Sequence, residues 1–108
     1  MSALPRRGEV WWYEAPDRDP RPVVVLSRNA AIPKLRRTVV APCSTVIRNL
    51  ATEVRLEPGE EPITLPSVVQ LDSVFNVSVA HLTARLGRLS DERIRRVCKA
   101  LTTALDFP

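Results

Sequence analysis

The stretch Arg21-Pro22-Val23-Val24-Val25-Leu26 decides the fold class, because it is a nearly uninterrupted apolar run of strand-forming residues. Three valines in succession favour extended backbone. Proline fits the first positions of a strand, where its missing N–H breaks no ladder hydrogen bond. An apolar run without alternation predicts a strand over 21–26 that is buried on both faces.

Further strands are predicted on both sides of this run, separated by polar segments that contain proline. Residues 14–20 hold two prolines among charged residues and are predicted to form a loop. Residues 27–37, broken by Pro33, are predicted to form a loop or a short helical turn, and Pro42 is predicted to end the third strand. The other predicted strands are 8–13, 38–41, 52–56, 67–77 and 85–89, with an acidic turn at 57–62 and a turn at 78–82.

The last segment has a helical period. Ser90 is placed as an N-cap, and two carboxylates follow in the first turn, where they oppose the helix dipole. The apolar residues recur at helical spacing, which predicts one buried face made of Ile94, Val97, Cys98, Leu101 and Leu105. Short strands followed by one amphipathic helix predict a mainly β fold, a small SH3-like half-open barrel with a C-terminal α-helix.

The length of 108 residues leaves room for one domain, which we place at 1–108. No apolar run approaches the roughly 18 residues that a membrane span needs. The first seven residues lack the apolar segment of a signal peptide. We therefore expect a soluble, cytoplasmic protein without a membrane partner.

The charge is unevenly distributed. Residues 1–56 carry a net charge of +5, whereas the remainder carries −1, and all but two of the sixteen cations are arginine. Arginine pairs bidentately with phosphate and stacks on bases, which is typical of a protein with a polyanionic partner. The alternative is that arginine replaces lysine as a solubilising cation because the coding DNA is rich in GC. Composition alone does not separate the two.

Several classes of site are excluded by what the chain lacks. Cys43 and Cys98 are too few for a zinc site or a disulfide framework, and their apolar neighbours predict two core residues. A single histidine, His81, excludes a mechanism with two imidazoles. Three glycines provide no dinucleotide fingerprint and no phosphate loop. We therefore expect no metal and no cofactor. Trp11 and Trp12 are adjacent in a strand, so one is expected in the core and the other at a dimer contact or against a base.

Three segments together resemble the MazF/PemK (Kid-like) toxins of bacterial toxin–antitoxin systems. They are Arg7-Gly8-Glu9-Val10-Trp11, Arg21-Pro22-Val23-Val24-Val25-Leu26-Ser27 and Val40-Ala41-Pro42-Cys43-Ser44-Thr45. Residues 67–74, 85–90 and the helix follow in the family's order. The resemblance implies a metal-independent endoribonuclease that cuts single-stranded RNA and leaves a 2′,3′-cyclic phosphate and a 5′-hydroxyl. It also implies a homodimer and a cognate acidic antitoxin of the MazE type.

The resemblance places the family's catalytic arginine at Arg21 and its catalytic threonine at Ser44. A fixed guanidinium stabilises the charge that builds on the phosphate oxygens as the 2′-hydroxyl attacks. A serine hydroxyl can donate a second hydrogen bond to that phosphate. Arginine is a poor base, so Asp17 or Asp19 is the candidate proton acceptor. Residues 15–20 are shorter than the family's loop and lack its Gly-Ser-Glu-Gln motif.

The expected RNA-binding residues lie on the segments that flank this pair. Asp72 is a candidate reader of a base edge, and the flanking arginines are expected to hold the phosphate backbone. The full expected set is Asp19, Arg28, Arg36, Arg37, Thr45, Arg48, Asp72 and Ser73. The alternative is a non-catalytic binding protein, either an RNA binder or a gyrase poison of the CcdB type. The ending Leu105-Asp106-Phe107-Pro108 lacks the tryptophan–glycine ending of the gyrase poisons.

Overall fold

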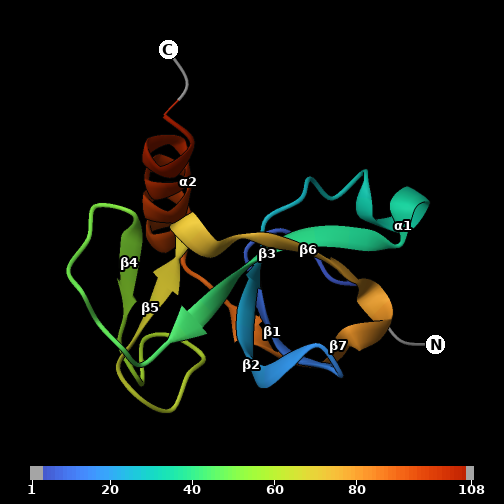
Figure 1. Ribbon diagram of the computed structural model, residues 1–108, viewed down its shortest axis with the longest axis horizontal. Helices are drawn as coiled ribbons and strands as arrows, with labels where there is room; N and C mark the ends of the chain where they lie inside the picture. The colour runs from blue at the N-terminus through green and yellow to red at the C-terminus, as the bar shows by residue number, and fades with distance from the viewer. Residues whose placement is uncertain (1–3, 107–108) are drawn as a thin grey trace.

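The computed structural model describes residues 4–106, so residues 1–3 and 107–108 of the predicted domain lie outside the described part. Seven strands form one open sheet with the order β4-β5-β3-β2-β1-β7, and β6 pairs with β3 off this path. Helix α2 stands beside β4 and β5, and α1 lies at the other end of β3 (Figure 1). The elements are β1 (Glu9–Ala15), β2 (Arg18–Val25), α1 (Ile32–Leu35), β3 (Arg37–Ser44), β4 (Glu53–Leu56), β5 (Ser67–Gln70), β6 (Phe75–Ser78), β7 (Leu82–Arg88) and α2 (Asp91–Leu105), with 3-10 turns η1 (Leu71–Ser73) and η2 (Val79–His81).

The mainly β fold with a C-terminal helix is confirmed, and the valine run is its centre. Val23 and Val25 point into one hydrophobic cluster with Trp11 and Tyr13, while Val24 points into a second cluster that α2 covers. Both clusters are buried because successive side chains of a strand alternate between the two faces of the sheet. The prediction of burial on both faces is therefore confirmed for Val23–Val25, whereas Arg21, Pro22 and Leu26 are only half-buried.

Pro42 was expected to end the third strand, and this prediction is wrong. β3 runs on to Ser44 and keeps Pro42 paired with Val23 of β2. On its other side, β3 pairs with β6 through residues 37–40 and with β5 through residues 43–44. Pro42 lies where β3 changes partner, so its missing N–H leaves no ladder bond unmade on that side. The sheet opens between β6 and β5 at this point of β3.

The segment 14–20 was expected to be a loop, which is also wrong. β1 continues to Ala15 and β2 already begins at Arg18, so only Pro16 and Asp17 connect them. The charged side chains are those of an exposed hairpin end and not of a flexible loop. The charged residues and prolines made this segment look like a loop in the sequence. Pro20 is tolerated in the strand because it lies at an irregularity in the pairing of β1 with β2.

The predicted strand 67–77 is two strands separated by η1. Asp72 lies in this turn, and its carboxylate accepts a hydrogen bond from the Thr52 hydroxyl. Polar residues in mid-strand thus mark a break, because their side chains bond locally and compete with the ladder. β7 begins at Leu82, three residues before the predicted start, whereas the turn before it and the β4 strand are found as predicted.

The helix begins as predicted, with the Ser90 hydroxyl accepting a hydrogen bond from the backbone N–H of Arg93 at 3.2 Å. Its buried face is rotated from the predicted one. Ala100 and Ala104 pack on the sheet with Val97 and Leu101, whereas Cys98 is exposed. The small alanines let the helix approach the sheet closely, which turns Cys98 and Leu105 away from the core. The prediction of a core residue is confirmed for Cys43 and wrong for Cys98.

No helix within residues 4–106 has both the length and the hydropathy needed to cross a bilayer.

A buried ion pair fastens α2 to the loop between β4 and β5. The Arg93 Nε donates to Glu61 Oε1 at 2.7 Å, and the two side chains are only 15% and 3% exposed. The other Glu61 oxygen is buried without a hydrogen-bond partner. Removing the guanidinium would leave a buried carboxylate with no counter-charge.

We expect Arg93→Met to lower the free energy of unfolding by about 3–5 kcal/mol, since an unpaired buried charge is costly. The double variant Arg93→Met/Glu61→Leu should recover most of this loss. Arg96→Met is the matched control, because the pair of Arg96 with Glu92 is exposed and worth at most about 1 kcal/mol. Urea unfolding measures all three. An Arg93→Met variant as stable as Arg96→Met would contradict the assignment.

The two thiols should react at very different rates. Burial raises the pKa of the Cys43 thiol to about 12, so Cys43 has almost no thiolate at neutral pH, whereas Cys98 is exposed. Ellman's reagent is expected to titrate Cys98 in the folded protein and Cys43 only after guanidinium is added. Cys98→Ser should leave the folded protein unreactive. Rapid reaction of both thiols without denaturant would show that the β3 packing is wrong.

Candidate active site

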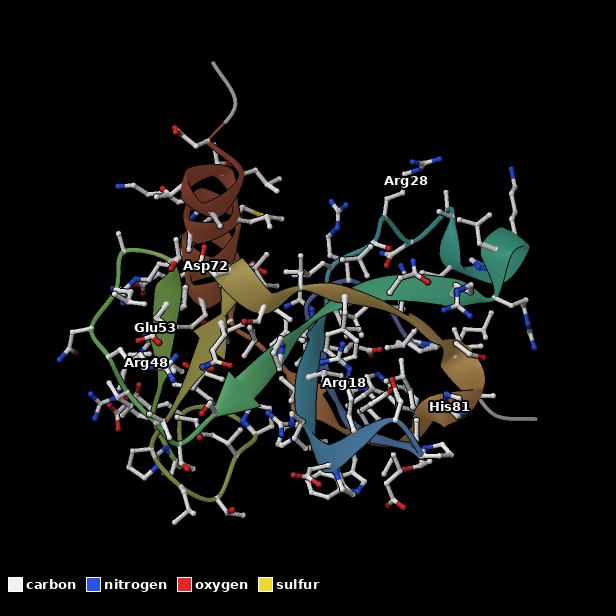
Figure 2. The ribbon with its side chains drawn as sticks, viewed as in Figure 1. Arg18, Arg28, Arg48, Glu53, Asp72 and His81 are labelled. Carbon is white, nitrogen blue, oxygen red and sulfur yellow. The ribbon has the colours of Figure 1, made fainter. Side chains whose placement is uncertain are left out.

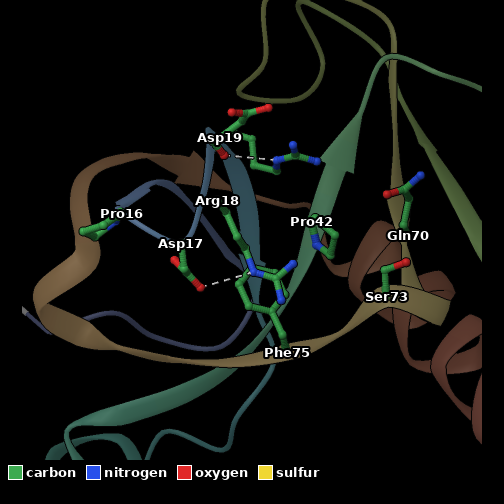
Figure 3. A pocket seen from close by; sticks show the side chains of 9 residues that line it. Pro16, Asp17, Arg18, Asp19, Pro42, Gln70, Ser73 and Phe75 are labelled. Atoms are coloured by element: carbon green, nitrogen blue, oxygen red, sulfur yellow. Dashed lines mark hydrogen bonds and ion pairs between the residues drawn. The ribbon is translucent and has the colours of Figure 1, made fainter.

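A cleft of about 540 Å³ opens between the β1–β2 hairpin and the segment from Gln70 to Phe75 (Figure 3). It is formed by the β1–β2 hairpin on one side, β3 and β5 at its floor, and the η1–β6 segment on the other side. The lining residues are Pro16, Asp17, Arg18, Asp19, Arg21, Pro42, Gln70, Ser73 and Phe75. Three of them, Asp19, Arg21 and Ser73, belong to the set expected from the sequence.

Arg21 is positioned by β2. It pairs with Tyr13 of β1 and lies two residues before buried Val23, so its side chain is on the face that opens into the cleft. The Arg21 Nε donates to the backbone carbonyl of Asp19 at 3.3 Å. Within residues 4–106 its two Nη atoms have no protein acceptor. The guanidinium is therefore anchored at one nitrogen, with its outer edge available to an anion.

Ser44 is the last residue of β3 and not part of a turn after it. The pairing of β2 with β3 ends at Val23 and Pro42, and Ser44 pairs with Val68 of β5. Ser44 lies two residues after Pro42, so the two side chains share one face of β3. Ser44 does not itself line the cleft, although Pro42, two residues earlier on the same face, does. The Ser44 Oγ accepts a hydrogen bond from the Val46 N–H at 3.1 Å, which leaves its own proton free to donate.

A second, smaller cleft of about 40 Å³ adjoins the first, since both are lined by Gln70 and Ser73. It contains Arg48 and Asp72, two further members of the expected set. The Glu53 carboxylate accepts hydrogen bonds from the backbone N–H groups of Arg48 and Leu50, which orders this loop. Thr45 is exposed in the bend that precedes it.

The remaining expected arginines lie away from the main cleft. Arg37 bonds to Asn76 and lines a neighbouring cleft of about 250 Å³, which shares Pro16 and Asp17 with the first. Arg28 lies in the loop before α1, far from Arg18 in Figure 2, and Arg36 caps the end of α1. The structure thus brings Arg21, Asp19 and Ser73 together, places Arg48, Asp72 and Arg37 in adjoining clefts, and separates Arg28 and Arg36 from them.

Sequence reasoning missed Arg18, Gln70 and Phe75. Gln70 interrupts an apolar strand in the sequence. A polar residue in such a strand indicates an exposed position as readily as a functional one. Arg18 lay in the predicted loop, and the pairing register that brings it beside Phe75 is not encoded in either segment alone. In the structure the Arg18 Cζ lies 3.8 Å from the centroid of the Phe75 ring.

A buried tyrosine supports this side of the cleft. The Tyr13 hydroxyl donates to Asp17 Oδ1 at 2.9 Å, and its ring meets Phe75 edge-on at 5.5 Å. Burial raises the pKa of Tyr13, and the hydrogen bond to Asp17 raises it further, so the phenol stays protonated and keeps donating. His81 packs edge-on against the same ring, as expected of a structural histidine.

The tryptophans differ as predicted in their burial. Trp11 lies in the core, and its indole N–H donates to the buried Glu9 carboxylate at 3.0 Å. Trp12 is half-buried on the other face and donates to Glu14 at 2.8 Å. Its proposed contact with a second copy of the chain stays a prediction.

Comparison with known proteins gives consistent results over nearly the whole chain. A family profile described as PemK-like, MazF-like toxin of type II toxin-antitoxin system matches residues 6–105. The chain is 63% identical over 106 residues to the probable endoribonuclease MazF5 of Mycobacterium tuberculosis (strain ATCC 25618 / H37Rv), covering 98% of this chain and 97% of that protein. It is 34% identical over 87 residues to endoribonuclease MazF3 of M. tuberculosis (strain CDC 1551 / Oshkosh), covering 81% and 84% of the two chains.

The fold is shared with solved structures as well. An endoribonuclease in complex with its cognate antitoxin from Mycobacterial species superposes with a TM-score of 0.86 at 26% identity, covering 96% of this chain and 97% of that one. The M. tuberculosis toxin MazF-mt6 superposes with a TM-score of 0.84 at 30% identity, covering 93% and 98%. The chain therefore belongs to the PemK-like, MazF-like toxin family of type II toxin–antitoxin systems.

Proposed function

We propose that this chain is a metal-independent endoribonuclease toxin that cuts single-stranded RNA at the cleft between the β1–β2 hairpin and β6. The family and the endoribonucleases it resembles support this function. The observation that carries the assignment to this site is the position of Arg21 in the lining of an open cleft, with no carboxylate partner among residues 4–106. Ser44 lies two residues after Pro42, which also lines this cleft. We propose that one phosphodiester contacts both side chains.

We assign Arg21 the role of binding the scissile phosphate. When the 2′-hydroxyl oxygen attacks the adjacent phosphorus, a P–O bond forms, the bond to the 5′-oxygen breaks, and negative charge builds on the non-bridging oxygens. A guanidinium that is already held in place stabilises this charge more in the transition state than in the ground state. The anchor from Nε to the Asp19 carbonyl supplies that placement without neutralising the cation.

Ser44 is assigned a second hydrogen bond to the same phosphate. Its oxygen is occupied as an acceptor by the Val46 N–H, so its proton is directed away from the backbone. The orientation of a donor before the reaction begins is what makes such a bond effective in catalysis.

Of the two carboxylates considered as general base, we assign Asp19. Asp17 accepts from the Tyr13 hydroxyl and pairs with Arg18 at 3.6 Å, so both of its oxygens are engaged. The Asp19 side chain lines the cleft, is exposed, and within residues 4–106 has no hydrogen-bond or ion-pair partner. An unengaged carboxylate beside Arg21 is placed to accept the 2′-hydroxyl proton, directly or through water.

The same cleft is proposed to bind the antitoxin. A relative of similar fold is known in complex with its cognate antitoxin. Arg21 and Arg48 line these clefts and have no carboxylate partner within residues 4–106, so an acidic segment that competes with RNA could pair with them. We expect the toxin to act as a homodimer. The binding-only alternative is less well supported, because the family profile and the named relatives are those of nuclease toxins.

The first test is cleavage of a long single-stranded RNA in excess EDTA. We expect discrete cuts that leave a 2′,3′-cyclic phosphate and a 5′-hydroxyl, and we expect Arg21→Ala to slow them by about 10³-fold or more, as for other arginines that stabilise phosphoryl charge. Arg95→Ala, which removes an exposed arginine of α2, is the matched control. Full activity in a folded Arg21→Ala protein would refute the site, and the absence of any cut by the wild type would refute the function.

Ser44 provides an independent test. Ser44→Ala removes one donor and should lower the single-turnover rate by about 10²–10³-fold with little change in RNA affinity. Ser44→Thr keeps a hydroxyl on the same strand position and should restore most of the rate. Circular dichroism checks that β3 is intact. If Ser44→Ala and Ser44→Thr are equally slow, the hydroxyl is not what matters at this position.

A further inference from the structure

We propose that Arg18, held by Phe75 and Asp17, is a stacking platform for one unpaired base of the RNA beside the cleavage site. The inference rests on the proposed function and deepens it, because it assigns a base-binding role to a side chain in the same cleft. Nothing in the cleavage chemistry described above uses Arg18 or Phe75.

The pairing of the β1–β2 hairpin turns Arg18 toward the cleft. Tyr13 pairs with Arg21, and Ala15 pairs with Arg18. The three residues Tyr13 to Ala15 are therefore matched by the four residues Arg18 to Arg21, a bulge that adds one residue near Asp19 and Pro20. Tyr13 and Ala15 share a face, and so their partners Arg21 and Arg18 share it too. In a regular strand, two residues three apart would point to opposite faces.

Arg18 is held by a closed set of contacts drawn from three elements (Figure 3). Its Cζ lies 3.8 Å from the Phe75 ring centroid, and its Nε lies 3.6 Å from Asp17 Oδ2. Asp17 is in turn held by the Tyr13 hydroxyl, and the Tyr13 ring packs on Phe75 at 5.5 Å. A long side chain that would otherwise sample many rotamers is thereby fixed before RNA arrives.

This arrangement suits a base better than a phosphate. The guanidinium is covered on one side by Phe75, and the side chain as a whole is still 46% exposed, so the group is open to the cleft. Its charge is partly balanced by Asp17, which weakens attraction for a phosphate but not stacking. Unpaired RNA bases stack on arginine planes as they do on aromatic rings, and such stacking tolerates any base. Arg21, without a carboxylate partner, is the phosphate ligand.

The test couples a protein change to an RNA change. The probe is a single-stranded oligonucleotide that spans a mapped cut, with a 2′-O-methyl group at the scissile nucleotide to block cleavage. A series of such probes carries one abasic nucleotide at each position in turn. Arg18→Lys keeps the charge but removes the planar group, and Arg95→Lys is the matched control. Fluorescence anisotropy measures the affinity of each protein for each probe.

For the wild type, we expect one abasic position near the cut to weaken binding by about 5–100-fold, the range of a lost base stack. Arg18→Lys should lose a similar factor on the intact probe and lose nothing more at that one abasic position. Phe75→Leu should reproduce this pattern more weakly, because Arg18 is then unsupported. Arg95→Lys should match the wild type throughout.

Two results would refute the platform while cleavage by Arg21 and Ser44 stands. In the first, Arg18→Lys and each abasic change lower the affinity by independent factors. In the second, Arg18→Lys binds every probe as tightly as the wild type. If the wild type neither binds nor cuts RNA, the proposed function falls and this inference falls with it. The two failures are thus distinguished by the wild-type cleavage assay alone.

Discussion

The change of partner along β3 is the constraint on which the rest of the structure depends. β3 pairs with β2 along its central part. On its other side, it pairs with β6 before Ala41 and with β5 after Pro42. A strand with two successive neighbours on one side cannot lie in a flat sheet. The opening between β6 and β5 is where Gln70, Ser73 and Phe75 surround the main cleft. The proline is tolerated there because neither neighbour needs its N–H.

A second irregularity turns arginine side chains of β2 toward that opening. The bulge in β2 brings two arginines, Arg18 and Arg21, to the same face of one strand. Bulges are frequent next to active sites because one extra residue re-aims a side chain without ending the strand. β3 holds Ser44, the other catalytic candidate, at its end. Both candidates therefore lie on strands and not on loops, which restricts the movement of their side chains.

The sequence predicts the parts of this fold that depend on local pattern. The valine run, the aromatic first strand and the Ser90 cap appear where periodicity and capping chemistry place them. Two of the errors have one cause, because proline and charge are interpreted as strand breakers at 14–20 and at Pro42. Pro20 and Pro42 lie inside strands because of what does or does not pair with them, and pairing is a property of distant segments. The rotated face of α2 is a similar case, since alanine signals burial only weakly in a sequence and yet decides how closely a helix packs.

The site shows the same division. Arg21 and Ser44 are candidates that the resemblance gives, whereas Phe75 and Arg18 meet only because β6 and the hairpin converge. Arg28 and Arg36 lie away from the clefts that the other candidates line. They were expected to flank the cleft because they are adjacent to strands in the sequence, but the loop before α1 lies at the other end of β3 (Figure 1).

The uneven charge of the chain acquires a physical meaning once the ion pairs are known. Four arginines of the second half are engaged by carboxylates: Arg85 binds buried Glu9, Arg93 binds buried Glu61, and Arg88 and Arg96 pair with acids of α2. Burial by itself would raise the pKa of Glu9, yet the hydrogen bonds from Arg85, Trp11 and the Arg6 backbone outweigh it and lower that pKa. Arg85 and Arg93 thus stabilise the fold, because each compensates a buried carboxylate.

The cations that face the three adjoining clefts all come from the first half, which carries the net charge of +5. They are Arg18, Arg21, Arg37 and Arg48. The same clefts are lined by the carboxylates Asp17, Asp19, Glu53 and Asp72, so the excess positive charge of the first half is not concentrated in them. Arg18 pairs with Asp17, whereas Arg21, Arg37 and Arg48 have no carboxylate partner within residues 4–106. A polyanion can therefore pair with these three arginines without displacing a carboxylate from any of them, a distinction that composition alone does not provide.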